Sequence, residues 1–307
     1  MSNLGTSTPI SARVAIVILN WNRWRLTKEC LDSLAVSDYP DQLIVVVDNG
    51  SGDDSVARLR ESDPSAEIIA TGSNLGFAGG CNVGIARALA GAADYVLLLN
   101  NDATVAPGAL RRLVASAKSA DAAICGARVM DEDGKVVLFD GRRWPGHIFG
   151  VDGVGLRDDS TEWSDSDCVD GCAILLRRDL LEQRLREHGY VLDPKFFMYC
   201  EDTDLCLYGR SKGFRCVVSH AALVRHGLAK SSGGSANPRS FYYLTRNRVS
   251  LANRWLSLPV RILFHCYYLP SRLLLLLMRP RSTRSAILQG LRDGYRGVTG
   301  IWSRHGV

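Results

Sequence analysis

Residues 95–103, with the sequence YVLLLNNDA, decide the predicted fold. The first five of them are apolar or aromatic without interruption, which is typical of a strand that is buried on both faces of a sheet. Asn100, Asn101 and Asp102 follow with no spacer, so an open parallel sheet would hold them at the edge where ligands bind. A carboxylate and two amides there could bind a divalent cation together with diphosphate oxygens of a ligand. The alternative is a plain turn, because Asn and Asp often bond to nearby backbone groups.

The chain before residue 95 alternates between strands and helices. Apolar patterns predict strands over 14–19, 43–47 and 66–70, and helices over 24–34, from about 53 onward and over about 78–90. This alternation predicts an α/β fold with a mostly parallel sheet and helices on both of its faces. Right-handed crossovers place the carboxyl ends of all four strands at one edge. We therefore expect Trp21, Asp48, the segment after Ala70 and Asp102 to meet in one crevice.

Polar residues follow the first two strands. Asn20 and Asn22 close the first strand, and DNGSGDDS over residues 48–55 closes the second. The carboxylate of Asp48 could accept a hydrogen bond from the imide N–H of a pyrimidine base. The alternative is an Asx-turn that joins the strand to the next helix.

A glycine-rich segment, GSNLGFAGGCNVG, occupies residues 72–84 at the start of a predicted helix. Its glycines allow the backbone to approach a phosphate or a ribose closely, and the N–H groups of a helix start favour negative charge. The segment matches neither the GxGxxG fingerprint nor the Walker pattern. The dinucleotide-binding and P-loop interpretations therefore lose support.

Beyond residue 120 the pattern is less regular. Strands are predicted over 122–129, 135–140, 168–176, 214–219 and 221–226, and residues 142–166 are expected to form an irregular loop. Gly171 and Cys172 could line a pocket wall because they lack bulk. Packing within a strand is the alternative.

Three acids, Glu201, Asp202 and Asp204, follow an aromatic run and open a predicted helix. One interpretation is electrostatic, because acids in the first turn are favoured by the helix dipole. The other is a general base, because burial among the aromatic side chains of residues 196–199 would raise the pKa of a carboxyl group.

His226 ends the last predicted strand and precedes a Ser/Gly-rich stretch. A lone histidine at a strand end is commonly structural, but an imidazole is also a good ligand for Mn²⁺ or Mg²⁺ in a site completed by Asp102. Lys230 and residues 231–235 are expected to close over a bound diphosphate.

Composition and charge are those of a globular protein. Of 307 residues, 46% are hydrophobic and 22% are charged. The formal charge is +5, and basic residues gather between Arg239 and Arg304, which suggests an anionic membrane surface or a polyanionic partner. Residues 1–13 carry no export or transit signal, so a cytosolic location is expected. Nine cysteines without paired C-x2-C spacing favour buried thiols over disulfides or zinc.

The region from residue 238 onward is predicted to be helical and amphipathic. Arg261, His265, Pro270 and Arg272 interrupt its apolar run, so an interfacial helix is favoured over a membrane span. The alternative is a pair of helices that packs on the domain or against a second subunit, which would make a homodimer.

These stretches, in their order across residues 14–235, resemble the inverting family 2 glycosyltransferases with the GT-A fold, and among them the bacterial rhamnosyltransferase-like subgroup. The resemblance rests on VAIVILNWNRWRLTKECLDSL, VVVDNGSGDDS, NLGFAGGCNVGI, YVLLLNNDATV, DGCAILLRR, FFMYCEDTDLCLYGRSKGF and VRHGLAKSSG. It implies a flexible N-terminus over 1–12 and a GT-A domain over 13–237, and it leaves a C-terminal amphipathic helical region over 238–307. Within the GT-A domain the nucleotide-sugar half would span about 13–120 and the acceptor half about 121–237.

The resemblance also implies residue roles. Asp48 is similar to the family acid that reads a pyrimidine base, Asp202 to the catalytic base, and His226 to the second metal ligand beside Asp102. Residues 100–102 stand where the family has its DxD-type motif, with Asn in the first position. The implied donor-binding residues are Asn20, Asn22, Asp48, Asn49, Asn74, Gly76, Gly79, Asn82, Asn100, Asn101 and Asp102. The expected acceptor-side residues are Gly171, Cys172 and Glu201.

The implied activity is metal-dependent, inverting transfer of a sugar from a nucleotide donor with Mg²⁺ or Mn²⁺. The favoured donor is dTDP-rhamnose, with UDP-sugars next, and the acceptor is a saccharide or a lipid-linked hydroxyl in cell-surface polysaccharide synthesis. The enzyme would act in the cytoplasm as a peripheral protein at the inner face of the cytoplasmic membrane, without a nucleic-acid partner. A sugar-1-phosphate nucleotidylyltransferase and a non-catalytic nucleotide-sugar-binding scaffold are the alternatives.

Overall fold

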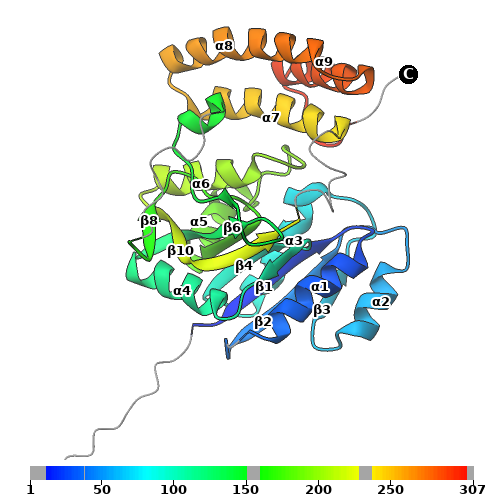
Figure 1. The fold of residues 1–307 in the computed structure, drawn as a ribbon, viewed down its shortest axis with the longest axis vertical. Helices are drawn as coiled ribbons and strands as arrows, with labels where there is room; N and C mark the ends of the chain where they lie inside the picture. The colour runs from blue at the N-terminus through cyan, green and yellow to red at the C-terminus, as the bar shows by residue number, and fades with distance from the viewer. Residues whose placement is uncertain (1–11, 38, 151–159, 228–236, 303–307) are drawn as a thin grey trace, which may run out of the picture.

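A computed structural model describes residues 12–37, 39–150, 160–227 and 237–302 (Figure 1). The predictions for the N-terminal residues before 12, and for Lys230 with residues 231–235, lie outside the described residues. The same holds for residues 151–159 of the predicted loop.

The first half of the fold is the predicted alternation of strands and helices. Its elements are β1 (Val14–Asn20), α1 (Trp24–Ala35), β2 (Gln42–Asp48), α2 (Ser55–Ser62), β3 (Glu67–Ala70), α3 (Gly76–Ala90) and β4 (Tyr95–Asn100). The four strands are parallel in the order β3-β2-β1-β4, so their carboxyl ends meet at one edge as expected. One boundary differs, because Asp53 and Asp54 precede α2 and do not form its first turn.

The second half of the sheet is mixed. It contains β5 (Ala103–Val105), α4 (Ala109–Ser119), β6 (Ala122–Met130), β7 (Val137–Phe139), a 3-10 turn η1 (Gly146–Phe149), β8 (Trp163–Asp165), β9 (Ala173–Arg177), α5 (Arg178–His188), α6 (Glu201–Ser211) and β10 (Arg215–His226). β9 lies antiparallel between β4 and β6, and β10 runs parallel to β6. No helical crossover precedes β9, so the chain is free to enter the sheet in the opposite direction.

The two short strands predicted over 214–219 and 221–226 are in fact one strand. β10 pairs with β6 on both sides of a register shift between Ser219 and Leu223. A bulge of this kind bends a strand without ending it, which explains why the sequence suggested two elements. The predicted irregular loop over 142–166 likewise contains η1 and β8.

Helices cover both faces of the sheet, and the strands between them are buried on both sides. Ile16 and Ile18 of β1 pack toward α1, α2 and α4, whereas Ala15 and Val17 pack toward α3, α5 and α6. All four side chains are at most 1% exposed. This two-sided burial is why the strand sequences are continuously apolar.

Three helices, α7 (Pro238–Trp255), α8 (Leu258–Leu277) and α9 (Arg281–Tyr295), form a layer at one end of the molecule, with α8 outermost (Figure 1). α7 begins where the Asn237 side chain accepts a hydrogen bond from the Arg239 N–H, with Pro238 in the first turn. α8 continues through Pro270 and is long and apolar enough, by length and composition, to cross a membrane. The residues that interrupt the apolar run were expected to disfavour a membrane span, but they do not keep α8 from meeting these criteria of length and composition.

The cysteines agree with the prediction of buried thiols. All nine are free, and seven of them are buried.

Candidate active site

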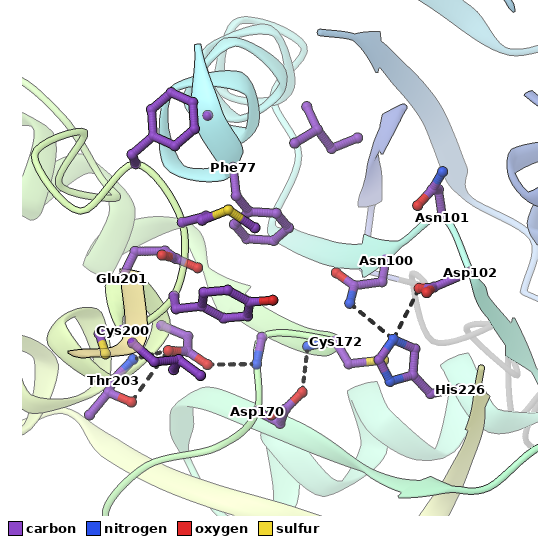
Figure 2. Close-up of a pocket in the computed structure, with 18 of the residues that line it drawn as sticks. Phe77, Asn100, Asn101, Asp102, Asp170, Cys172, Cys200, Glu201, Thr203 and His226 are labelled. Atoms are coloured by element: carbon purple, nitrogen blue, oxygen red, sulfur yellow. Dashed lines mark hydrogen bonds and ion pairs between the residues drawn. The ribbon is translucent and has the colours of Figure 1, made fainter. Parts of the chain in front are cut away.

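A cavity of about 440 Å³ lies where the carboxyl ends of the parallel strands meet the acceptor half of the sheet. Eleven of the sixteen predicted site residues line it: Asn49, Asn74, Gly76, Asn100, Asn101, Asp102, Gly171, Cys172, Glu201, Asp202 and His226. Figure 2 shows two polar groups at this cavity, with Asn100, Asp102 and His226 on one side and Glu201 near Thr203 on the other. The residues of the first group are of the types that bind a cation, and those of the second are of the types that transfer a proton.

The first group joins the ends of two strands. β10 pairs with β5 so that His226 lies opposite Ala103, which brings the imidazole beside the residues that follow β4. Nε2 of His226 is 3.0 Å from Oδ1 of Asp102 and 3.3 Å from Nδ2 of Asn100. Burial lowers the pKa of His226, but the hydrogen bond and the charge of Asp102 outweigh it, so the pKa is raised above its ordinary value.

This pair fits a divalent cation in part. Two adjacent ligands of an octahedral cation with bonds of about 2.1 Å are about 3 Å apart, and the Asp102 and His226 atoms have this separation. Within the described residues, no group of three or more His, Cys, Asp or Glu could hold a metal by itself. A cation here would therefore take its remaining ligands from the substrate or from water.

The second group is built at the start of α6. Oδ2 of Asp202 accepts a hydrogen bond of 3.0 Å from the backbone N–H of Gly171, and Oδ1 accepts one of 2.6 Å from the N–H of Thr203. A Cβ on residue 171 would lie only 3.2 Å from the Cβ of Asp202. Gly171 thus permits the close approach that fixes the carboxylate, which explains the small residue at this wall.

The three acids of this segment have different surroundings. Glu201 is 5% exposed, and burial, followed by the charge of Asp202, raises its pKa well above the ordinary value. Its Oε2 is buried without a hydrogen-bond partner. Asp204 is fully buried and forms ion pairs with Arg184 and Arg254, so it is a structural residue.

The glycine-rich segment and the turn after β2 form another wall. Asn49 accepts a hydrogen bond from the N–H of Leu75 and donates to the carbonyl oxygen of Gly76. Gly76 has φ +76°, and a Cβ there would lie 2.4 Å from the carbonyl oxygen of Phe197. A residue without a side chain is required at this point, where α3 begins.

The other predicted donor-site residues do not line the cavity. Oδ2 of Asp48 accepts hydrogen bonds from Asn20 and from the Ser51 hydroxyl, and its Oδ1 accepts one from the Ser51 N–H. This local turn is the alternative that the sequence left open. Asn22 accepts a hydrogen bond from the N–H of Gly52 in the same turn.

Two predicted residues of α3 also lie away from the cavity. Asn82 exchanges two hydrogen bonds with the backbone of Leu192, and therefore ties α3 to the segment before α6. A Cβ on Gly79 would lie 2.9 Å from the side chain of Leu75. Both residues stabilise the wall without forming it.

Several cavity residues were not predicted. Arg239 and Arg248 enter the cavity from α7, and neither forms an ion pair with a carboxylate among the described residues. The guanidinium of Arg239 lies 5.3 Å from the ring centroid of Trp21 and 5.8 Å from that of Phe197. One signal for them is present in the sequence, the closely spaced arginines of residues 239–248, but that segment was assigned to the C-terminal region.

α7 also shapes the turn that presents the acids. Phe197, Tyr199 and Cys200 have positive φ values of 65°, 67° and 75°, a conformation that non-glycine residues rarely adopt. The side-chain amide of Asn247 donates to the carbonyl oxygens of residues 196, 198 and 199, and Arg246 donates to those of residues 195 and 196. The strained turn is therefore held from α7.

Comparisons with known proteins agree with this geometry. The N-acetylglucosaminyl-diphospho-decaprenol L-rhamnosyltransferase of Mycobacterium tuberculosis is 28% identical over 258 residues, which cover 75% of this chain and 82% of that protein. The structure of S. aureus TarS 1-349 with UDP-GlcNAc has a TM-score of 0.59 at 16% identity, covering 93% of this chain and 81% of that one. The mannosyltransferase PcManGT from Pyrobaculum calidifontis, in complex with GDP-Man and Mn²⁺, has a TM-score of 0.57 at 17% identity, covering 92% and 87%.

The structural likenesses confirm the expected GT-A fold. The model of the family described as glycosyl transferase family 2 matches residues 15–184. Because this match spans more than half of the sequence, the chain belongs to glycosyl transferase family 2.

Proposed function

We propose that this glycosyltransferase is an inverting enzyme that moves rhamnose from dTDP-rhamnose to a hydroxyl of a saccharide or lipid-linked acceptor. The observation that carries the proposal is the placement of Asp202, which two backbone N–H groups fix at the same cavity as Asp102 and His226. The choice of rhamnose and of a lipid-linked acceptor is supported by the name of the mycobacterial relative. A UDP-sugar is the second candidate donor.

Asp202 is the catalytic base of the proposed reaction. Its carboxylate takes the proton of the acceptor hydroxyl while that oxygen attacks the anomeric carbon. The bond from the anomeric carbon to the diphosphate oxygen breaks on the opposite face, so a single displacement inverts the configuration. A second catalytic carboxylate is not needed, because no covalent glycosyl intermediate forms.

Asp102 and His226 would hold Mg²⁺ or Mn²⁺ at the donor end of the cavity. When bound, the cation supplies positive charge that stabilises the departing nucleoside diphosphate. Asn49, Asn74 and Gly76 form the wall along which the nucleotide would lie. Asp48 fixes the turn beside that wall, and its contact with the base is a prediction of the resemblance.

Arg239 and Arg248 add positive charge to the cavity and lack carboxylate partners among the described residues. Guanidinium groups bind phosphate oxygens well, so they suit an acceptor that carries a diphosphate, as the name of the mycobacterial relative's substrate does. Such an acceptor would be presented at the cytoplasmic face of the membrane, in cell-surface polysaccharide synthesis.

The test is a donor panel of dTDP-, UDP- and GDP-sugars with Mn²⁺ or Mg²⁺, in which released nucleoside diphosphate is measured. We expect slow hydrolysis or saturable binding of dTDP-rhamnose that chelator abolishes and added Mn²⁺ restores. Asp102→Ala should lose both the hydrolysis and the binding of dTDP-rhamnose. Release of pyrophosphate from a sugar-1-phosphate and dTTP would instead support a nucleotidylyltransferase, and no donor binding at all would contradict the proposal.

Asp202→Asn separates binding from chemistry. The amide has the size of the carboxylate but cannot take the proton, so donor binding measured by calorimetry should stay within about threefold, whereas turnover should fall by at least about a hundredfold. Undiminished turnover in this variant would rule out the assigned role and would favour the scaffold alternative.

A further inference from the structure

α8 exposes an apolar face that no other part of the described chain covers. We define the outer face by Ile262, Leu263, Leu273, Leu274, Leu277 and Met278, whose side chains are 47% to 77% exposed. These positions recur at helical spacing, and every exposed residue of α8 is uncharged. In Figure 1 α8 is the outermost element of the helical layer, at the end of the molecule far from the sheet.

The exposed charged residues of the three C-terminal helices are all arginines. Asp293 is the only acidic residue of the chain after Asp204, and it accepts a hydrogen bond from the hydroxyl of Tyr242. Arg281 and Arg284 are exposed in the first turn of α9, next to the end of α8. An apolar face on a helical layer whose exposed charges are arginines is complementary to a membrane with anionic headgroups.

We propose that the outer face of α8 lies in the plane of an anionic membrane, with its leucines in the acyl boundary and Arg281 and Arg284 at the headgroups. A second copy of the chain is a poorer occupant. A dimer through this face would bring together two helical layers whose exposed charges are all arginines.

The inner side of α8 explains why the helix would lie flat. Phe264 and Tyr268 are at most 1% exposed, their rings are stacked at 4.7 Å, and the Tyr268 hydroxyl donates to the carbonyl oxygen of Thr245 in α7. A membrane-spanning orientation would have to break this packing. The in-plane orientation keeps it.

This orientation would also place the cavity near the membrane. Thr245 lies between Leu244 and Arg248 in α7, and these two residues line the cavity. One helix thus separates the membrane face from the cavity, so an acceptor could keep its lipid tail in the bilayer while its sugar reaches Asp202. This last step rests on the proposed function, but membrane binding itself does not.

The experiment is vesicle flotation of the full-length protein without nucleotide sugar. The probes are phosphatidylcholine vesicles and vesicles with about one third phosphatidylglycerol, at two salt concentrations. We expect at least about tenfold tighter binding to the anionic vesicles, weakened by salt. Equal binding to both vesicles, or no binding to either, would overturn the proposal.

Matched variants locate the surface. Leu263→Glu and Leu274→Glu should each reduce binding about tenfold, because each places a charge in the acyl boundary. Leu185→Glu is the control, since Leu185 is a 40% exposed leucine on α5, in a different part of the fold. Loss of binding in the control, or retention of binding in both α8 variants, would contradict the assignment.

Arg281→Gln with Arg284→Gln should remove much of the preference for anionic lipid.

Two further measurements address the other occupants. Light scattering should give a monomer for both the wild type and Leu274→Glu, and a wild-type dimer that this substitution dissociates would assign the face to a second copy instead. Protein bound to membranes should be released by alkaline carbonate, and resistance to it would show a span. Donor hydrolysis by Leu274→Glu should equal that of the wild type. A failure of membrane binding can therefore be distinguished from a failure of the proposed chemistry.

Discussion

Glu201 and Asp202 are adjacent in the chain, yet their environments assign them different tasks. Two N–H groups hold the carboxylate of Asp202 at the cavity, whereas Glu201 is buried with one oxygen unpartnered. Burial favours the neutral carboxyl form, so a protonated Glu201 avoids placing a second negative charge beside Asp202.

Glu201→Gln tests this difference through the pH dependence of stability. The pKa of Glu201 is raised in the folded state, so its stabilising contribution is complete below the unfolded value of 4.5 and is lost as the pH rises toward the folded pKa. Glutamine does not titrate. The melting temperature of the variant, relative to wild type, should therefore rise by several degrees between pH 5 and pH 8. A difference that is constant with pH would contradict the assigned protonation.

At the scale of the element, the start of α3 depends on a glycine. Gly76→Ala would place a Cβ 2.4 Å from the carbonyl oxygen of Phe197 at φ +76°, so it should cost about 3 kcal/mol or more and weaken donor binding. Denaturant unfolding and donor titration measure the two effects.

Gly72→Ala is the matched control, because Gly72 has nearly the same φ, +74°, with no atom within 4 Å of a new Cβ. It should show only the cost of the backbone conformation, about 1–2 kcal/mol. Equal losses of unfolding free energy in the two variants would mean that the contact with Phe197 is unimportant for stability.

α7 belongs to the active site in a physical sense, because it holds the turn before the two acids. Asn247→Ala would leave the carbonyl oxygens of Met198 and Tyr199 without the Asn247 amide, and should cost about 2–4 kcal/mol. Turnover should fall as well, because the strained turn can relax and displace Asp202. Thermal unfolding and turnover of the purified variant are the measurements.

Asn253→Ala serves as the control on the same helix. Asn253 is exposed, and its side chain forms one hydrogen bond within the described residues, with the half-buried His265. The change should therefore be within about 0.5 kcal/mol and should spare turnover. A large loss of stability or turnover in Asn253→Ala would show that any side-chain truncation on α7 has this effect.

At the scale of the whole molecule, an ion-pair network joins the sheet domain to the C-terminal helices. Asp204 of α6 pairs with Arg184 of α5 at 2.7 Å and with Arg254 of α7 at 2.8 Å, and Arg254 also pairs with Asp193. We therefore expect the helices after residue 237 to unfold together with the sheet domain.

Asp204→Asn should destabilise the protein by about 3–5 kcal/mol, because it leaves the buried guanidinium of Arg184 without its carboxylate. Unfolding followed by tryptophan fluorescence and by circular dichroism should remain one coincident transition. Asp32→Asn, which removes the exposed Lys28–Asp32 pair, is the control and should change stability by less than about 0.5 kcal/mol. Two separate transitions in the wild type would refute the coupling.

Much of the architecture was determined by the sequence itself. The continuous apolar runs predicted β1, β2 and β4, and polar residues directly after them predicted where Asn49, Asn100 and Asp102 would meet. These predictions succeed because the burial pattern of a strand is visible in its own residues. Strands joined by right-handed crossovers are parallel, so their carboxyl ends lie at a common edge of the sheet.

The tertiary structure decided the rest. Only packing turned Asp48 and Asn82 away from the cavity and brought Arg239 and Arg248 into it from a helix far along the chain. The sequence indicated that burial would raise the pKa of an acid in this segment, but only packing assigned that effect to Glu201. The periodicity of apolar residues specifies which face of a helix or strand is buried. It does not specify what packs against that face, because the partner comes from a segment distant in the sequence.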